Sequence, residues 1–491
     1  MGASKNTASK SAFNGHGLKK AIDMLLSEIR ELYLADGIPW VIGYSGGKDS
    51  TAALQLVWLA LESLGKDHYS KPVHVISTDT YVENPVVAGW VRESLKRIDT
   101  AAKKKELPIQ PHHLTPELND TFWVNLIGRG YPAPRPKFRW CTDRLKINPS
   151  NKFINEVVQS NGEAILVLGT RKAESSARAR SMEHHEKGRT RHRLSPNASL
   201  PNSLVFTPIE DWSNDDVWLF LMQTKNPWGN NNKDLLSMYQ GATEGGECPL
   251  VIDSSTQSCG DSRFGCWVCT MVDKDKSMEA MIQNDEEKEW MLPLLQLRDE
   301  LDIPDDKHLR DFRRMKGNLQ LYHGNLIRGP YIQSTREHWL RKVLEAQEWI
   351  RQNGPKEVRG IELITFEELN EIRRIWVMDK HEIEDTLPQI YEEVTGQSFP
   401  GEEFDENQTF GANELKILKD LCGDDFLHYE LVRELINVEQ KYSTMAKRAG
   451  LFDALDKAIT RSFYEDSDDA TERARKKEKS LQEITNSSQV Y

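Results

Sequence analysis

Short apolar runs alternate with helical stretches through the first half of the chain, and this alternation most constrains its fold. Strands that alternate with helices pack as a parallel sheet, and ligands of such sheets bind at the carboxyl ends of the strands. The sequence therefore predicts an α/β domain with a doubly wound, mainly parallel sheet over residues 18–225. The expected strands are 41–44, 73–77, 109–114 and 165–168, and the expected helices are 18–35, 51–63 and 86–103.

The rest of the chain differs in composition from this domain. Residues 226–275 are rich in Gly, Ser, Asn and Cys and are expected to form a loop segment held by four cysteines. A mainly helical region is expected over 276–461, whereas 1–17 and 462–491 are too polar to offset the entropy of ordering and are expected to be a disordered leader and tail. The helices expected in this half are 276–300, 335–351, 366–379, 412–421 and 431–459.

The composition of the chain indicates where in the cell the protein is found and which kinds of partner it binds. The 491 residues contain no apolar run long enough to cross a membrane, and residues 1–17 lack the apolar core of a signal peptide. We therefore expect a cytoplasmic protein without a membrane partner, whose six cysteines are ligands or free thiols. The net charge of −12 argues against a generic polyanion binder, yet residues 129–193 hold 15 Lys and Arg against 6 Asp and Glu, a local charge of +9. This basic block is expected to receive phosphates, and the alternative is a solvated face of mixed charge.

A glycine-rich segment separates the first expected strand from the helix that follows, and it consists of Ser45, Gly46, Gly47, Lys48, Asp49 and Ser50. Glycines let backbone amides approach phosphate oxygens, while the helix N-terminus, the lysine and the serine hydroxyls add donors. The spacing differs from a Walker A loop, because Lys48 is followed by Asp49 rather than Ser or Thr. The segment resembles the PP-loop of the ATP pyrophosphatase superfamily. That resemblance implies binding of ATP, its cleavage between the α and β phosphates, and Mg²⁺ at Asp49.

Further segments resemble PAPS reductases in the same order along the chain. They begin at Ser77, at Trp140, at Gly169 and at Pro208. The resemblance implies an adenine nucleotide alpha hydrolase-like, Rossmann-like fold, and a nucleotide site lined by Asp79, Arg144, Lys146, Gly169, Arg171, Glu174 and Arg178. The residues expected to neutralise phosphate charge are Lys48, Arg144, Lys146, Arg171 and Arg178. The Glu-Cys-Gly segment with which PAPS reductases attack sulfate is absent from this sequence, so reduction by that route is not expected.

Four cysteines lie close together with the spacing C-x10-C-x6-C-x2-C, and they are Cys248, Cys259, Cys266 and Cys269. Four thiolates in a loop of small residues suit tetrahedral zinc or an iron-sulfur cluster. The spacing by itself leaves both metals open. Cys422 lies in a helical stretch and is expected to be a core thiol.

This cysteine segment, placed between a PAPS reductase-like domain and a helical half, resembles the DndC-type sulfurtransferases of bacterial DNA phosphorothioation. The resemblance implies a 4Fe-4S cluster on the four cysteines and ATP pyrophosphatase activity. It also implies a cysteine desulfurase as sulfur donor, other DNA phosphorothioation proteins as partners, and DNA as the acceptor in which sulfur replaces a non-bridging phosphate oxygen. The sequence leaves direct contact with DNA open, and the basic block 129–193 is the segment that could dock its backbone phosphates.

The expected chemistry starts with adenylation of the acceptor oxygen and ends with displacement of AMP by sulfur. The residues expected to act in it are Lys48, Asp49, Cys141 and Arg144. Neighbouring arginines are expected to lower the pKa of Cys141, so the cluster and Cys141 are both candidate sulfur carriers, and the alternative for Cys141 is a small residue that lines the nucleotide site. Alternative functions are a PAPS reductase-like or tRNA-thiolating enzyme, or a non-catalytic assembly subunit that carries the cluster.

Overall fold

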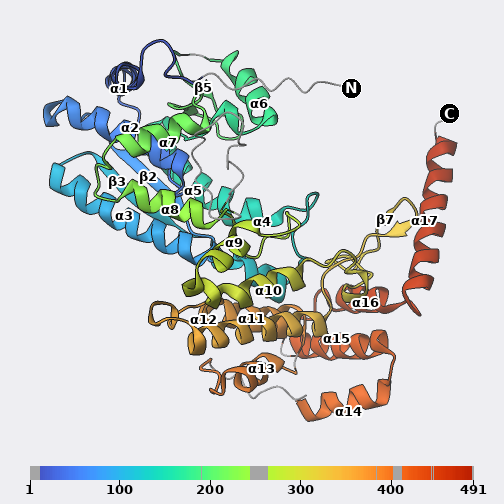
Figure 1. Ribbon diagram of the computed structural model, residues 1–491. Coiled ribbons are helices and arrows are strands. Elements are labelled where there is room, and N and C mark those ends of the chain that lie inside the picture. Colours follow the sequence, from blue (N-terminus) through green and yellow to red (C-terminus); the bar gives the residue numbers. More distant parts are fainter. Residues whose placement is uncertain are drawn as a thin grey trace, which may run out of the picture. The chain divides into compact units, whose positions relative to one another are not determined.

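A computed structural model of the chain describes residues 11–189, 191–243, 264–382, 384–401, 412–443, 445 and 447–488 (Figure 1). The chain divides into two compact units. The first unit comprises Met1–Glu117 and Arg135–Arg298, and the second comprises Leu118–Pro134 and Asp299–Tyr491.

The first unit is built on a six-stranded sheet in the order β3-β2-β1-β4-β6-β5. All neighbouring strands run parallel except β5 and β6, which are antiparallel. The predicted α/β class with a mainly parallel sheet is confirmed. The strands are β1 (Trp40–Gly43), β2 (Val73–Thr78), β3 (Ile109–Leu114), β4 (Ala164–Val167), β5 (Ser195–Pro196) and β6 (Ser203–Phe206).

Alternating side chains of the buried strands divide the core between the two faces of the sheet. Trp40 and Ile42 of β1 pack with residues of α1, α2, α3, α7 and α8, whereas Val41 packs with Ile154 and Val157 of α5. The period of two along β1 thus places helices on both faces, as in a doubly wound fold. The helices of this unit are α1 (Leu18–Leu34), α2 (Lys48–Leu64), α3 (Pro85–Lys105), α4 (Trp140–Thr142), α5 (Asn148–Asn161), α6 (Ser176–Glu186), α7 (Asn214–Gln223), α8 (Asn232–Gly241) and α9 (Lys276–Asn284), and α10 (Leu292–Leu301) contains the boundary between the units.

The strand order reverses its direction of growth at β1, which pairs with β2 on one side and with β4 on the other. In doubly wound sheets the ligand site lies at such a point, at the carboxyl edge of the sheet, and here the loops that follow β1 and β4 begin there. The expected phosphate loop follows β1 and the expected Gly169 segment follows β4. The topology therefore brings the two segments to the same edge.

Two expectations for the first unit are wrong. Residues 11–17 of the expected disordered leader are ordered, because Ser11 and the Ala12 amide donate hydrogen bonds to Asp216 and Phe13 packs edge-on against Trp212. The expected loop segment 226–275 contains the helix α8. Asn232 anchors that helix, since its side-chain amide donates to Gln55 at 3.0 Å.

Asp216 also stabilises the start of a helix. It accepts from the Ser213 amide and forms a capping box at the start of α7.

The second unit is mainly helical, as predicted. Its elements are the hairpin strands β7 (Leu321–Tyr322) and β8 (Asn325–Leu326) and the helices α11 (Gln333–Asn353), α12 (Phe366–Arg374), α13 (Thr386–Thr395), α14 (Ala412–Cys422), α15 (Phe426–Ser443), α16 (Leu451–Ser462) and α17 (Ser467–Ser488). Figure 1 shows α17 beside the β7 hairpin. The expected disordered tail 462–491 is therefore wrong for α17, whose Arg475 donates to the carbonyl of Gly324 at 2.7 Å.

Residues Leu118–Pro134 were expected to lie within the α/β domain, yet they belong to the second unit. Trp123 donates its indole N–H to the carbonyl of Leu363 at 2.7 Å, and Trp376 donates to that of Ile127 at 3.0 Å. Both indoles are buried, so these two bonds pair polar groups that would otherwise stay unsatisfied in the core.

Among the described residues, no helix combines the length and apolarity needed to cross a bilayer.

Two histidines on neighbouring strands of the first unit form a half-buried pair. His74 Nδ1 of β2 lies 3.0 Å from His112 Nε2 of β3, and the ring of Phe153 packs against both. Burial, aided by the charge of His112, lowers the pKa of His74 to about 4 from 6.5. Burial likewise lowers the pKa of His112.

This pair predicts a specific loss of stability in acid. A group whose folded pKa is depressed binds fewer protons in the folded than in the unfolded state, so the protein loses stability as the pH falls from 6.5 towards about 4. We expect His74→Gln to flatten the fall of the urea midpoint over this pH range relative to wild type. His68→Gln, at an exposed position, is the control. An unchanged pH dependence in His74→Gln would contradict the assignment.

Candidate functional site

The segment Ser45–Ser50 forms a tight loop that leads from β1 into the first turn of α2. Gly46 adopts φ +73°, a conformation that favours glycine, and a Cβ there would lie 2.5 Å from Val91. The hydroxyls of Ser45 and Ser50 lie 3.1 Å apart, and Ser50 Oγ also accepts from the Ser45 amide at 3.2 Å. The amides of Asp49 and Ser50 lie in the first helical turn, where no carbonyl four residues earlier belongs to the helix. The loop thus presents hydroxyls and amide donors suited to an anion.

A charged triad joins this loop to the segment after β4. Arg171 Nε donates to Asp49 Oδ1 at 2.7 Å, and Lys48 Nζ lies 3.4 Å from Asp49 Oδ2. Arg171 is 4% exposed and also donates to the carbonyl of Trp212 at 3.3 Å. Two cations around one carboxylate leave an excess positive charge at the loop, which favours a phosphate ligand.

Burial sets the protonation of the lysine. Desolvation of the Lys48 side chain, which is 9% exposed, lowers its pKa, and the positive charge of Arg171 acts in the same direction, while Asp49 opposes both. The side chain therefore gains from an added anion more than a solvated lysine does.

Gly169 allows the two loops to touch. A Cβ at this position would lie 2.6 Å from the carbonyl oxygen of Asp49 and 2.8 Å from the amide of Ser50. Glu174 fixes the same segment, because it accepts from the Arg171 amide at 2.8 Å and pairs with Arg178 at 3.5 Å. Glu174 and Arg178 were predicted as nucleotide-binding residues; the contacts that they make here shape the loop, and contact with a nucleotide stays a prediction.

Two residues of the loop environment escaped the sequence analysis. The ring of Tyr239 on α8 lies 5.1 Å from Lys48 Nζ, and its hydroxyl accepts from the Lys48 amide at 3.4 Å. Trp90 on α3 donates its indole N–H to the carbonyl of Gly46 at 3.1 Å. The apolar spacing of Leu235 and Tyr239 was a signal for α8, but segment composition had favoured a loop.

Asp79 follows β2 at the same carboxyl edge of the sheet. It accepts from the Tyr81 amide at 2.9 Å, and His113 Nε2 lies 3.4 Å from its carboxylate. Burial tends to raise the pKa of Asp79, but the bonds from His113 and the Tyr81 amide outweigh it and hold the pKa below its ordinary value. Asp79 therefore stays ionised at neutral pH.

The described half of the cysteine segment packs against residues just beyond Asp79. Glu83 and Cys266 form an isolated antiparallel bridge, the Trp267 amide donates to the Val82 carbonyl at 2.9 Å, and the Cys269 amide donates to the Cys266 carbonyl at 3.0 Å. Residues 266–269, here named the cysteine turn, thereby hold Cys266 and Cys269 beside the 79–83 segment. Cys248 and Cys259 lie outside the described residues.

Cys266 is half-buried, and its surroundings are polar. Its Sγ lies 3.5 Å from Thr80 Oγ1 and 3.8 Å from Glu83 Oε1. Burial, aided by the charge of Glu83, raises the pKa of Cys266 to about 12. A metal ion bound there has to displace this proton, as at other thiolate sites.

Lys146 belongs to the same surroundings. Its Nζ lies 3.1 Å from Glu83 Oε1, and its charge acts on Cys266. The structure thus brings a residue expected at the phosphates beside the cysteine turn.

The expected lowering of the Cys141 pKa is wrong. Burial raises the pKa of this thiol, and the charge of Cys269 acts in the same direction. Arg139, one of the arginines expected to stabilise a thiolate, is exposed and donates to the carbonyl of Pro136 at 3.2 Å. The coupling to Cys269 nevertheless places Cys141 near the cysteine turn. Arg144 occupies the adjoining turn Asp143–Ile147, and its role stays a prediction.

No group of three or more His, Cys, Asp or Glu side chains is arranged to hold a metal ion within the part of the chain that the structure describes. Half of the expected cysteine ligands lie outside that part. Asp49, the expected Mg²⁺ ligand, is paired with Arg171 and Lys48, and its metal role stays a prediction.

Comparison with known protein families agrees with this geometry. Residues 39–271 match the phosphoadenosine phosphosulfate reductase domain family. The match begins just before β1 and ends just after Cys269, so it spans the phosphate loop, the segment after β4 and the cysteine turn. This part of the chain is therefore similar to PAPS reductase domains, in agreement with its mainly parallel sheet.

Two curated relatives match parts of the chain. An uncharacterised protein of Methanocaldococcus jannaschii is 28% identical over 190 residues, which cover 39% of this chain and 32% of that protein. An uncharacterised nin region protein of Escherichia phage lambda is 28% identical over 131 residues, which cover 24% of this chain and 42% of that protein. The match thus spans less than half the length of either relative.

Solved structures show distant likeness. A PAPS reductase from Candida auris, in complex with phosphate, is 13% identical, with 42% of this chain and 89% of that chain covered and a TM-score of 0.27. The U34-tRNA thiolase NcsA from Methanococcus maripaludis, solved with its 4Fe-4S cluster, is 14% identical, with 62% and 86% covered and a TM-score of 0.29.

The close approach at Gly169 predicts that even a methyl group is harmful there. Since the added Cβ would meet backbone atoms on the neighbouring loop, neither of which ends a flexible side chain, we expect Gly169→Ala to reduce the free energy of unfolding by about 1–3 kcal/mol. Urea denaturation measures this change. Gly241→Ala, where a Cβ meets nothing within 4 Å, is the matched control. Equal stability of the two variants would refute the contact.

Proposed function

We propose that this chain is an ATP pyrophosphatase and sulfurtransferase that adenylates a DNA backbone phosphate oxygen, so that sulfur can replace it. The observation that carries the proposal is the loop Ser45–Ser50, where buried Lys48 and Arg171 converge on the first turn of α2. The family match of residues 39–271 supports the nucleotide chemistry. The choice of DNA as the acceptor rests on the sequence resemblance to DNA phosphorothioation sulfurtransferases.

In the first step, a non-bridging oxygen of the DNA phosphate attacks the α phosphorus of ATP. The bond from that phosphorus to the oxygen shared with the β phosphorus breaks, and pyrophosphate leaves with the electron pair. Lys48 and the amides of the first turn of α2 stabilise the charge that collects on pyrophosphate. Asp49, held by Arg171, orients the lysine and is the residue that would bind Mg²⁺ beside the phosphates.

In the second step, a sulfur nucleophile attacks the adenylated phosphorus and AMP leaves with the bridging oxygen. If the sulfur arrives as a persulfide on Cys141, a second thiol attacks the Cys141 sulfur, forms a disulfide with it and leaves the transferred atom on phosphorus. A cellular thiol reductant then restores both cysteines. A cysteine desulfurase is the proposed donor, and other DNA phosphorothioation proteins are the proposed partners.

The cysteine turn suits a thiolate-bound cluster, because the half-buried Cys266 lies beside the polar side chains of Thr80 and Glu83, and Glu83 is paired with Lys146. With Cys248 and Cys259 they would hold the proposed 4Fe-4S cluster. When bound, a cluster held by four cysteines can transfer an electron. The protein supplies the hydrogen bonds and the cation around Cys266.

The role proposed for Lys48 leads to a first test, which measures ATP cleavage. We expect Lys48→Ala to lower pyrophosphate release from ATP by on the order of a hundredfold, since it removes the buried cation at the leaving group. Radiolabelled ATP, with duplex DNA or tRNA as acceptor, measures the release and the labelled product. Lys19→Ala, at an exposed position on α1, is the control. Full activity in Lys48→Ala would exclude the loop as the catalytic site. Adenylation of tRNA without adenylation of DNA would show that the acceptor is tRNA and not DNA.

The proposed cluster at the cysteine turn leads to a second test, which measures metal content. We expect anaerobically purified protein to contain about four iron and four sulfide per chain, and Cys266→Ser to lose most of both. Cys422→Ser, which alters a cysteine outside the turn, should keep them. Iron and sulfide analysis makes the measurement. One zinc per chain, without iron or sulfide, would rule out the cluster.

A further inference from the structure

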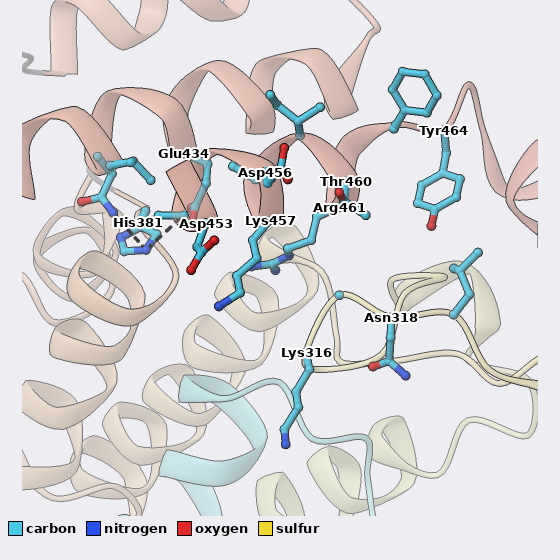
Figure 2. A pocket seen from close by; sticks show the side chains of 18 of the residues that line it. Lys316, Asn318, His381, Glu434, Asp453, Asp456, Lys457, Thr460, Arg461 and Tyr464 are labelled. Carbon is cyan, nitrogen blue, oxygen red and sulfur yellow. Dashed lines mark hydrogen bonds and ion pairs between the residues drawn. The ribbon is translucent and has the colours of Figure 1, made fainter. Parts of the chain in front are cut away.

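The second unit contains a large cleft that the proposed chemistry does not use (Figure 2). It has a volume of about 1490 Å³ and is lined by α15, α16, α17 and the segment that leads into β7. Single small molecules occupy pockets of roughly 300–1,000 Å³, so the cleft is large for a metabolite. It has the size to take several units of a polymer.

Cations outnumber acids along this cleft. The lining includes six Lys and Arg against four Asp and Glu, a net charge of +2 in a chain whose net charge is −12. Figure 2 shows Lys457 and Arg461 neighbouring one another on α16, with Lys316 on the adjacent segment. All three are exposed, and among the residues that the structure describes their side chains form no ion pair. Cations without a carboxylate partner are available to an added polyanion.

Aromatic rings stand at the end of the cleft. Phe463 is 66% exposed, although Arg473 on α17 lies 5.1 Å from its ring centre, and the same guanidinium lies 6.0 Å from the ring of Tyr464. Both aromatic residues and Arg473 line the cleft. An exposed ring stacked with arginine is a platform on which an unpaired base can stack.

We propose that this cleft binds single-stranded DNA, with Lys316, Lys457 and Arg461 on the backbone phosphates and Phe463 against a base. The choice of DNA rests on the proposed function, whereas the binding mode rests on the cations, the exposed ring and the size of the cleft. Duplex DNA hides its base faces, so it can use the cations but not the ring. The proposal therefore assigns DNA capture to the second unit, in addition to the basic block 129–193 of the sequence analysis.

The test is fluorescence anisotropy of the full-length chain, without ATP, with a labelled single strand of about 20 nucleotides and the matching duplex. We expect Lys457→Glu combined with Arg461→Glu to weaken single-strand binding by at least about tenfold at low salt and to make the salt dependence shallower. Phe463→Ala should weaken binding of the single strand by on the order of tenfold, with little effect on the duplex. Lys419→Glu, an exposed lysine of α14 outside the cleft, is the matched charge reversal.

A second measurement guards against a folding defect in the double variant. A single strand that carries iodouracil should crosslink to the peptide containing Phe463 and Tyr464 in the wild-type chain. Wild-type affinity in the double variant, an equal effect of Lys419→Glu, or crosslinks confined to residues 129–193 would each overturn the proposal. Pyrophosphate release by the wild-type chain decides the proposed function separately, because the anisotropy assay contains no ATP.

Discussion

The contact between the loops that follow β1 and β4 fixes the positions of the charged side chains at the carboxyl edge of the sheet in the first unit. Arg171 reaches across to Asp49, Asp49 holds Lys48, and Gly169 allows the two backbones to meet without a side chain between them. These loops meet because β1 and β4 are neighbours at the point where the strand order reverses. Buried cations at a helix N-terminus are costly without an anion, so the arrangement is one that a phosphate ligand would stabilise.

Strand β2 extends this edge from the phosphate loop to the cysteine turn. Asp79 follows the end of β2, and four residues later Glu83 forms an isolated β-bridge with Cys266. Lys146 lies against Glu83, and Cys141 is close enough to Cys269 for their charges to interact. The carboxyl end of β2 and the cysteine turn are therefore joined through one short backbone segment, residues 79–83.

The second unit has a different character. Its helices are joined by buried ion pairs and indole hydrogen bonds, such as those of Arg336 with Glu382 and of Trp123 with Leu363. Its cleft carries exposed cations and an exposed ring rather than buried charge. Buried charge suits tight positioning of a small anion, whereas exposed cations suit a polyelectrolyte that exchanges with salt.

The sequence by itself determined the parallel α/β class, the positions of β1 to β4 and the glycine-rich loop after β1, because these follow from local periodicity and from a motif read between a strand and a helix. It did not predict β5 and β6. It missed α8, the order of residues 11–17 and α17, since each is held by partners distant in sequence, such as Asp216 for Ser11 and Gly324 for Arg475. Only the tertiary structure decided that Lys146 lies at the cysteine turn and that Cys141 has a raised pKa. Burial and the charges of residues remote in the chain set both, and a linear motif contains neither.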